Sequence, residues 1–184
     1  EGRDDTFGYG KVNARRTLIL VTDVFPALAL GMGKGEEGIM KQLPRNPKEP
    51  IITTNHWISA GVYGLSITIA VIGITIYAHY VMEATYQVVN NMAFYTLVLA
   101  QLLNVFNIPH REFSFFKNEV TTNVWIWGAL ALSIVILVLA NIIPVLERVL
   151  SLVLLTSQEF FIICVFGLGT LVISQSLKRL GVTL

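Results

Sequence analysis

Charge is scarce in this chain, and so are the residues from which soluble proteins build metal or redox sites. Only 14% of its 184 residues are charged, whereas 54% are hydrophobic. A composition this apolar argues against an ordinary soluble domain and is typical of a helical membrane bundle. The net charge is +1 and no run of basic residues occurs, so we expect no nucleic-acid partner.

Cysteine occurs once, at Cys164, which excludes an internal disulfide and a cysteine-based zinc site. The three histidines are His56, His79 and His110, and none has a second histidine or a cysteine three or four residues away. We therefore interpret each as an interfacial or loop histidine rather than as a metal ligand.

Long stretches without fixed charge recur along the chain. Four of them approach or exceed the roughly 20 residues that an α-helix needs to cross a bilayer, and a shorter apolar stretch precedes them. The segment 147–158 mixes polar and apolar residues in a way that predicts a short amphipathic helix on the membrane surface. We predict an all-α polytopic membrane protein with about five transmembrane helices, at residues of about 18–32, 57–82, 91–108, 122–143 and 159–177.

The first span, 18–32, is short and carries one carboxylate, Asp23, next to Thr22 and three residues before Pro26. A carboxylate at bilayer depth costs a few kcal/mol, so it is retained mainly where it meets a cation, a proton or water. Pro26 has no N–H and frees the carbonyl of Thr22, so the sequence predicts a broken helix that offers oxygens to a hard cation. A soluble core helix capped by Thr22 or Asp23 would explain the same stretch, but the composition favours the membrane.

The third span, 91–108, carries three amides, Gln101, Asn104 and Asn107. Gln101 and Asn104 share one helix face, and Asn107 is rotated further round. Amides on membrane helices often hydrogen-bond a neighbouring helix. For Gln101 a second interpretation stays open, that of a cation ligand.

Lysine and arginine are unevenly distributed between the predicted loops. The loops 33–56 and 109–121 and the C-terminal tail together hold most of them, whereas the two opposite loops hold only Arg148. The positive-inside rule therefore predicts that loop 33–56 and the C-terminus lie in the cytoplasm. We expect an integral protein of the plasma or inner membrane. Basic residues just before the first span disagree with this orientation.

The first 17 residues differ from the rest of the chain, because they are polar and rich in charge of both signs. The segment Phe7–Ala14 resembles the segment leading into the last helix of subtilisin-like proteases, but none of the catalytic residues of that family is present. We interpret residues 1–17 as a soluble segment of foreign or rearranged origin, joined near Thr17, and infer no protease activity from it.

Residues 21–31, followed by 39–50, strongly resemble the C-terminal membrane half of P-type cation-transporting ATPases, most of all the calcium-type branch. Residues 92–107 are similar to the eighth membrane helix of that family. The resemblance covers about 18–180. It implies that the five predicted spans are the sixth to tenth helices of a ten-helix pump, and that 33–56 is the cytoplasmic loop that touches the phosphorylation domain.

The same resemblance implies a partial cation site. Asp23 and Thr22 match cation-binding positions of the sixth helix. Gln101 stands where two-site calcium pumps carry a glutamate, which fits a one-site pump better. The transported ion is then Ca²⁺ or another cation.

The chain also departs from the family pattern. Ile19 replaces an asparagine that the family usually has before the sixth-helix aspartate, and the phosphorylation motif and the nucleotide domain are lacking. We therefore expect no catalytic residue and no cofactor in this chain, with ATP and Mg²⁺ acting only in the parent pump. The expected partners are the lipid bilayer and the missing N-terminal half of a pump or another membrane subunit. The alternative is a non-enzymatic membrane subunit or regulator that packs against a pump.

Overall fold

The computed structural model describes residues 6–32, 54–107, 119–143, 150 and 152–181. Every regular element among these residues is a helix, and no strand occurs among them. The elements in chain order are α1 (Thr6–Gly31), α2 (Thr54–Tyr80), α3 (Tyr86–Asn104), the 3₁₀ helix η2 (Val105–Asn107), α4 (Glu119–Thr122), α5 (Val124–Ile142) and α7 (Ser157–Arg179).

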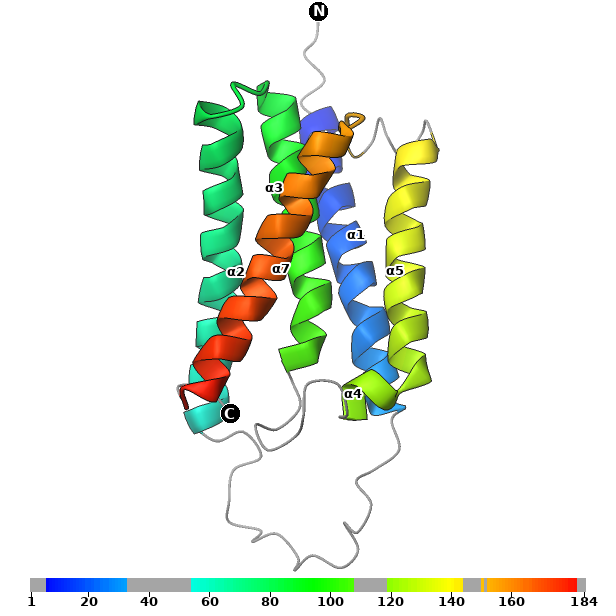
Figure 1. The fold of residues 1–184 in the computed structure, drawn as a ribbon. Helices are drawn as coiled ribbons and strands as arrows, with labels where there is room; N and C mark the ends of the chain where they lie inside the picture. The colour runs from blue at the N-terminus through cyan, green and yellow to red at the C-terminus, as the bar shows by residue number, and fades with distance from the viewer. Residues whose placement is uncertain (1–5, 33–53, 108–118, 144–149, 151, 182–184) are drawn as a thin grey trace, which may run out of the picture.

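The five long helices lie side by side and alternate in direction (Figure 1). Helices α1, α3 and α7 end at the same end of the bundle, where α2 and α5 begin. Helix α3 is central, because it packs against α2, α7 and α1, whereas α5 packs mainly against α1. Each predicted span corresponds to one helix, so the prediction of an all-α polytopic protein is confirmed.

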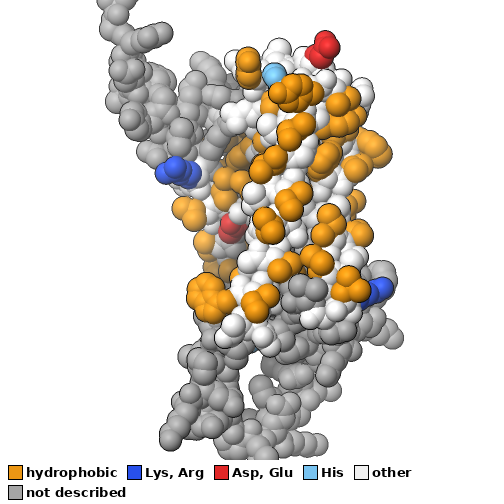
Figure 2. Space-filling model, turned by 90° about the vertical axis from the view of Figure 1, so that its left-hand side faces the viewer, with side chains coloured by type: hydrophobic (Ala, Val, Ile, Leu, Met, Phe, Trp, Pro, Cys, Tyr) orange, Lys and Arg blue, Asp and Glu red, His pale blue; other side chains and the backbone are white. Residues whose placement is uncertain are grey.

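Among the described residues, three helical segments are long and apolar enough to cross a membrane by length and composition: Thr54–Tyr80, Tyr86–Asn107 and Ser157–Arg179. A shorter apolar helix covers Val124–Ala140. On one face of the bundle, hydrophobic side chains recur along most of its height, with polar side chains and backbone between them (Figure 2). An outward apolar face of this kind suits contact with lipid chains rather than with water.

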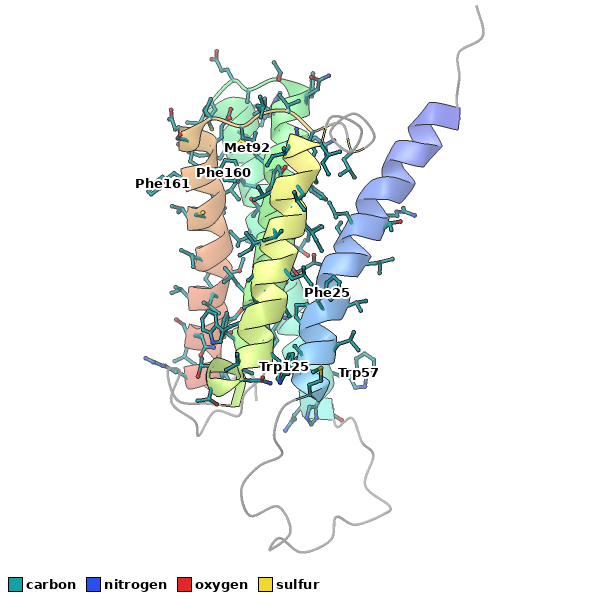
Figure 3. All side chains as sticks on the ribbon, turned by 90° about the vertical axis from the view of Figure 1, so that its right-hand side faces the viewer. Phe25, Trp57, Met92, Trp125, Phe160 and Phe161 are labelled. Atoms are coloured by element: carbon teal, nitrogen blue, oxygen red, sulfur yellow. The ribbon has the colours of Figure 1, made fainter. Side chains whose placement is uncertain are left out.

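Exposed aromatic side chains mark both ends of the bundle. Trp57 and Trp125 are more than half exposed and lie at the end where α2 and α5 begin, whereas Phe160 and Phe161 lie toward the other end (Figure 3). Tyrosine and tryptophan are enriched at the two membrane–water interfaces because their rings are amphipathic. The two tryptophans therefore fit one interface of a bilayer.

Helix α1 differs from its prediction in two ways. It begins at Thr6 rather than near residue 18, and it continues without interruption through Pro26 to Gly31. The prediction of a broken helix was therefore wrong. A proline inside a helix removes one backbone hydrogen bond, but the turns on either side keep theirs, so the helix can continue. The helix also crosses position 17, and the foreign origin of residues 1–17 stays a prediction.

The predicted surface helix over 147–158 lies partly outside the described residues, at 147–149 and 151. In its described part Leu152–Thr156 has no helical structure, and α7 begins directly afterwards. Thr156 Oγ1 accepts a hydrogen bond from the backbone N–H of Glu159, and the Glu159 carboxylate accepts one from the N–H of Thr156. This capping box sets the start of α7 and keeps the residues before it out of the helix.

Glycine allows two pairs of helices to approach closely. A Cβ at Gly167 of α7 would lie 2.7 Å from Leu99 Cδ2 of α3, and one at Gly73 of α2 would lie 2.9 Å from Phe166 Cε1 of α7. Small residues bring membrane helices together because packing, not burial from water, drives their association. These contacts hold α2, α3 and α7 as one unit, against which α1 and the hollow described below are placed.

Candidate cation site

A hollow lies between α1 and α3, with a cavity volume of about 250 Å³, and it is open on one side. The described residues of its walls come from these two helices and the start of η2. The lining residues are Asp23, Pro26, Ala27 and Leu30 from α1, and Gln101, Leu102, Asn104 and Val105 from the other wall.

Helical spacing explains why these residues meet. The α1 residues stand at positions i, i+3, i+4 and i+7, which form one face of an α-helix. Gln101, Asn104 and Val105 repeat the same spacing on the facing helix. The structure therefore brings the predicted residues Asp23 and Gln101 to one hollow, and their role as cation ligands stays a prediction. The side chain of Thr22, the third predicted residue, lies outside the described part of the chain.

The Gln101 side chain has an oxygen that no described residue satisfies. Its Oε1 is buried and has no hydrogen-bond partner among the described residues. Leaving a buried acceptor unpaired costs about 1–3 kcal/mol, so such a group calls for an explanation. Thr96 Oγ1 is also buried and unpaired within the described structure, but Thr96 does not line the hollow.

The amides of α3 and η2 were expected either to hydrogen-bond a neighbouring helix or, for Gln101, to bind a cation. In the structure they differ in their hydrogen-bond partners. Asn107 hydrogen-bonds a neighbouring helix, since its Oδ1 accepts from Gln175 Nε2 of α7 at 2.8 Å. Gln101 does not make such a bond through its oxygen. For Gln101 the choice between a packing role and a cation ligand is therefore not decided by a hydrogen bond of its oxygen, and the ligand role stays a prediction.

Asn104 is a lining residue for which the sequence suggested packing against a neighbouring helix and no ligand role. It contributes to the hollow one turn after Gln101, and its Oδ1 accepts a hydrogen bond from Asn107 Nδ2 at 2.9 Å. The three-residue spacing from Gln101 was the signal that could have identified it.

The hollow offers one carboxylate and two amides, all of them oxygen donors. No group of three or more histidine, cysteine or acidic side chains occurs among the described residues. Ca²⁺ takes six to eight oxygen ligands, among them carboxylates and amide carbonyls. The donor set of the hollow therefore fits part of a site for a hard cation.

Comparison with known sequences extends these observations. The family described as "Cation transporting ATPase, C-terminus" matches residues 18–180. The chain is 32% identical over 144 residues to a "Calcium-transporting ATPase" of Bacillus subtilis (strain 168), covering 78% of this chain and 16% of that protein. It is 27% identical over 173 residues to "Calcium-transporting ATPase 1" of Bacillus cereus (strain ATCC 10987 / NRS 248), covering 86% of this chain and 20% of that protein.

The chain thus spans between a sixth and a fifth of the length of these two relatives. The family match begins at Leu18, so residues 1–17 lie outside it. The alternative of a non-enzymatic subunit or regulator is not favoured by these comparisons.

Proposed function

This chain belongs to the C-terminal family of cation transporting ATPases, and from that premise we propose that it forms part of the membrane domain of an ATP-driven Ca²⁺ pump. The observation that carries the proposal is that Asp23 and Gln101 line one hollow, and that the buried Gln101 Oε1 has no partner among the described residues. A carboxylate and an amide that line one hollow offer oxygen ligands of the kind that a hard cation binds.

In this proposal Asp23 supplies the negative charge of the site and Gln101 an uncharged oxygen from the facing helix. Thr22 adds an oxygen of its side chain or backbone, because Pro26 cannot donate a hydrogen bond to the Thr22 carbonyl. The hollow is open on one side, which leaves room for further oxygens from another helix. The chain alone therefore holds a partial and weak site.

The parent activity has further requirements. ATP and Mg²⁺ would act on the phosphorylation and nucleotide domains of the pump, which this chain lacks. The proposed partners are the bilayer and the N-terminal half of the pump. The proposed orientation puts the ends of α1, α3 and α7 on the cytoplasmic side, because the basic loops follow these ends.

Equilibrium binding of ⁴⁵Ca²⁺ to the whole chain in lipid nanodiscs tests this proposal. We expect a dissociation constant of about 10⁻⁴–10⁻³ M, the range of calcium sites with few charged ligands. Asp23→Asn should weaken binding about tenfold or more, since it removes the only carboxylate among the described residues that line the hollow. The matched control is Glu83→Gln, an exposed carboxylate outside the hollow, which should leave binding unchanged. Equal binding by the wild type and Asp23→Asn would overturn the proposal.

A further inference from the structure

A chain of side-chain hydrogen bonds runs from the hollow to α7, which does not line it. Asn104, on the wall of the hollow, accepts at Oδ1 from Asn107 Nδ2 at 2.9 Å. Asn107 accepts at its own Oδ1 from Gln175 Nε2 at 2.8 Å, and Gln175 Nε2 also donates to the backbone carbonyl of Phe106 at 3.1 Å. The chain therefore links α7 to the cation hollow through two amides.

The direction of every bond in this chain follows from its last member. The carbonyl of Phe106 can only accept, so Gln175 must turn its nitrogen toward it. That nitrogen can only donate, so Asn107 must present its oxygen to Gln175 and its nitrogen to Asn104. Asn104 must then hold its oxygen toward Asn107. One glutamine on α7 thereby decides which atom of Asn104 is held in place.

The link is also firmly anchored. Asn107 is 3% exposed, and its backbone carbonyl accepts from Lys178 Nζ at 2.7 Å. Lys178 is itself only 5% exposed. A charge-assisted hydrogen bond from a buried ammonium is stronger than a neutral one, so it fixes η2 against the last turn of α7.

We propose that Gln175 is a positioning residue for the cation hollow, and that Asn104 Oδ1 is a further oxygen of that site. A carbonyl oxygen has two lone pairs, so Asn104 Oδ1 can accept from Asn107 and still face a cation. Oxygen ligands of metal ions are commonly held by hydrogen bonds of this kind from residues that do not touch the metal. The inference rests on the proposed function, because it assigns a support to the site that contains Asp23 and Gln101.

The test is a double-mutant cycle on ⁴⁵Ca²⁺ binding by the whole chain in nanodiscs. We expect Gln175→Leu to weaken binding about three- to tenfold, less than the 10- to 100-fold typical when a direct support of a ligand is lost. Asn104→Ala should weaken it at least as much, and the double variant should bind like Asn104→Ala alone. The inference would be overturned if the loss of Ca²⁺ affinity in the double variant equals the product of the losses in the two single variants. It would also be overturned if Gln175→Leu folds and binds Ca²⁺ as the wild type does.

Asn107→Leu keeps roughly the size of the side chain but has no donor or acceptor and adds no charge, so it breaks the same chain without a large cavity and should weaken binding similarly. If it binds as the wild type does, the inference fails even where Gln175→Leu does not fold. Ser176→Ala is the matched control on α7, because the Ser176 hydroxyl is exposed and donates to Val172 within its own helix. It should leave binding unchanged.

A second readout needs no bound ion and separates this inference from the proposed function. The side-chain amide resonance of Asn104, measured by NMR in Ca²⁺-free nanodiscs, should shift in Gln175→Leu and stay in place in Ser176→Ala. If wild type and Asp23→Asn bind Ca²⁺ equally, the proposed function fails, whereas the shift still supports positioning of Asn104 by Gln175. If the chemical shift of the Asn104 side-chain amide is the same in Gln175→Leu as in the wild type, the inference is overturned, whatever the Ca²⁺-binding experiment gives.

Discussion

The side chain of Asn123 joins two helices that are far apart in the sequence. Its Oδ1 accepts from the backbone N–H of Trp125 and caps α5, while its Nδ2 donates to the carbonyl of Ala29 in α1 at 3.2 Å. Ala29 lies in the last turn of α1, where backbone carbonyls have no partner within the helix. One amide thus satisfies both helix ends and holds α5 against the helix that carries Asp23.

Asn123→Ala should therefore lower the stability of the fold by about 1–2 kcal/mol, since it removes a cap and leaves a helix-end carbonyl unpaired. Thermal unfolding in a mild detergent, followed by circular dichroism, measures the change. Asn123→Ser keeps a capping oxygen but not the amide donor, so its melting temperature should fall between those of the wild type and the alanine variant. A melting temperature of Asn123→Ala equal to that of the wild type would contradict this role.

The contact between Gly167 and Leu99 gives a second prediction. A Cβ at Gly167 would lie 2.7 Å from Leu99 Cδ2, closer than packed atoms approach, so Gly167→Ala should destabilise the fold by about 1–3 kcal/mol. Gly169→Ala is the matched control two residues along the same helix, because a Cβ there meets nothing within 4 Å. It should be neutral or slightly stabilising, since alanine favours helix more than glycine does.

The same unfolding assay can show whether the clash itself is the cause. Adding Leu99→Ala to Gly167→Ala should recover part of the lost stability, because it removes the side chain that the new methyl group meets. Equal melting of the two glycine variants would show that α3 and α7 do not approach as closely as described.

The orientation of the bundle in the membrane is a third prediction. The ends of α1, α3 and α7 are expected in the cytoplasm, since most lysine and arginine residues of the loops follow these ends. Green fluorescent protein fused after Leu184 should be fluorescent in bacterial cells. The same fluorescent protein inserted in the loop between α5 and α7 should be dark. The reverse pattern would show that the basic residues before the first span decide the orientation.

The sequence predicted the helices better than their ends. Uncharged stretches identified the spans because length and composition alone decide whether a segment can cross a bilayer. The start of α1 was missed because its first turns are polar, and the continuity of α1 through Pro26 was missed because a proline was assumed to break it. The start of α7 depends on the capping box of Thr156 and Glu159. This local signal was missed because the apolar residues after 147 suggested a helix that runs through the same positions.

The candidate site was predictable in part. Asp23 and Gln101 could be selected from the sequence because a carboxylate and an amide stand out on membrane helices. That they line one hollow depends on how α1 packs against α3, which no local pattern reveals. The link from Asn104 through Asn107 to Gln175 joins residues about 70 positions apart, so only the fold shows it.

The central claim is that a cation binds between Asp23 and Gln101, and adding charge at Gln101 tests it most directly. Calcium affinity rises with the number of charged ligands, so Gln101→Glu should tighten ⁴⁵Ca²⁺ binding by about tenfold. Gln87→Glu adds the same charge to an exposed position near the start of α3 and should change nothing. If Gln101→Glu and Gln87→Glu both bind Ca²⁺ as the wild type does, the hollow between α1 and α3 is not a cation site.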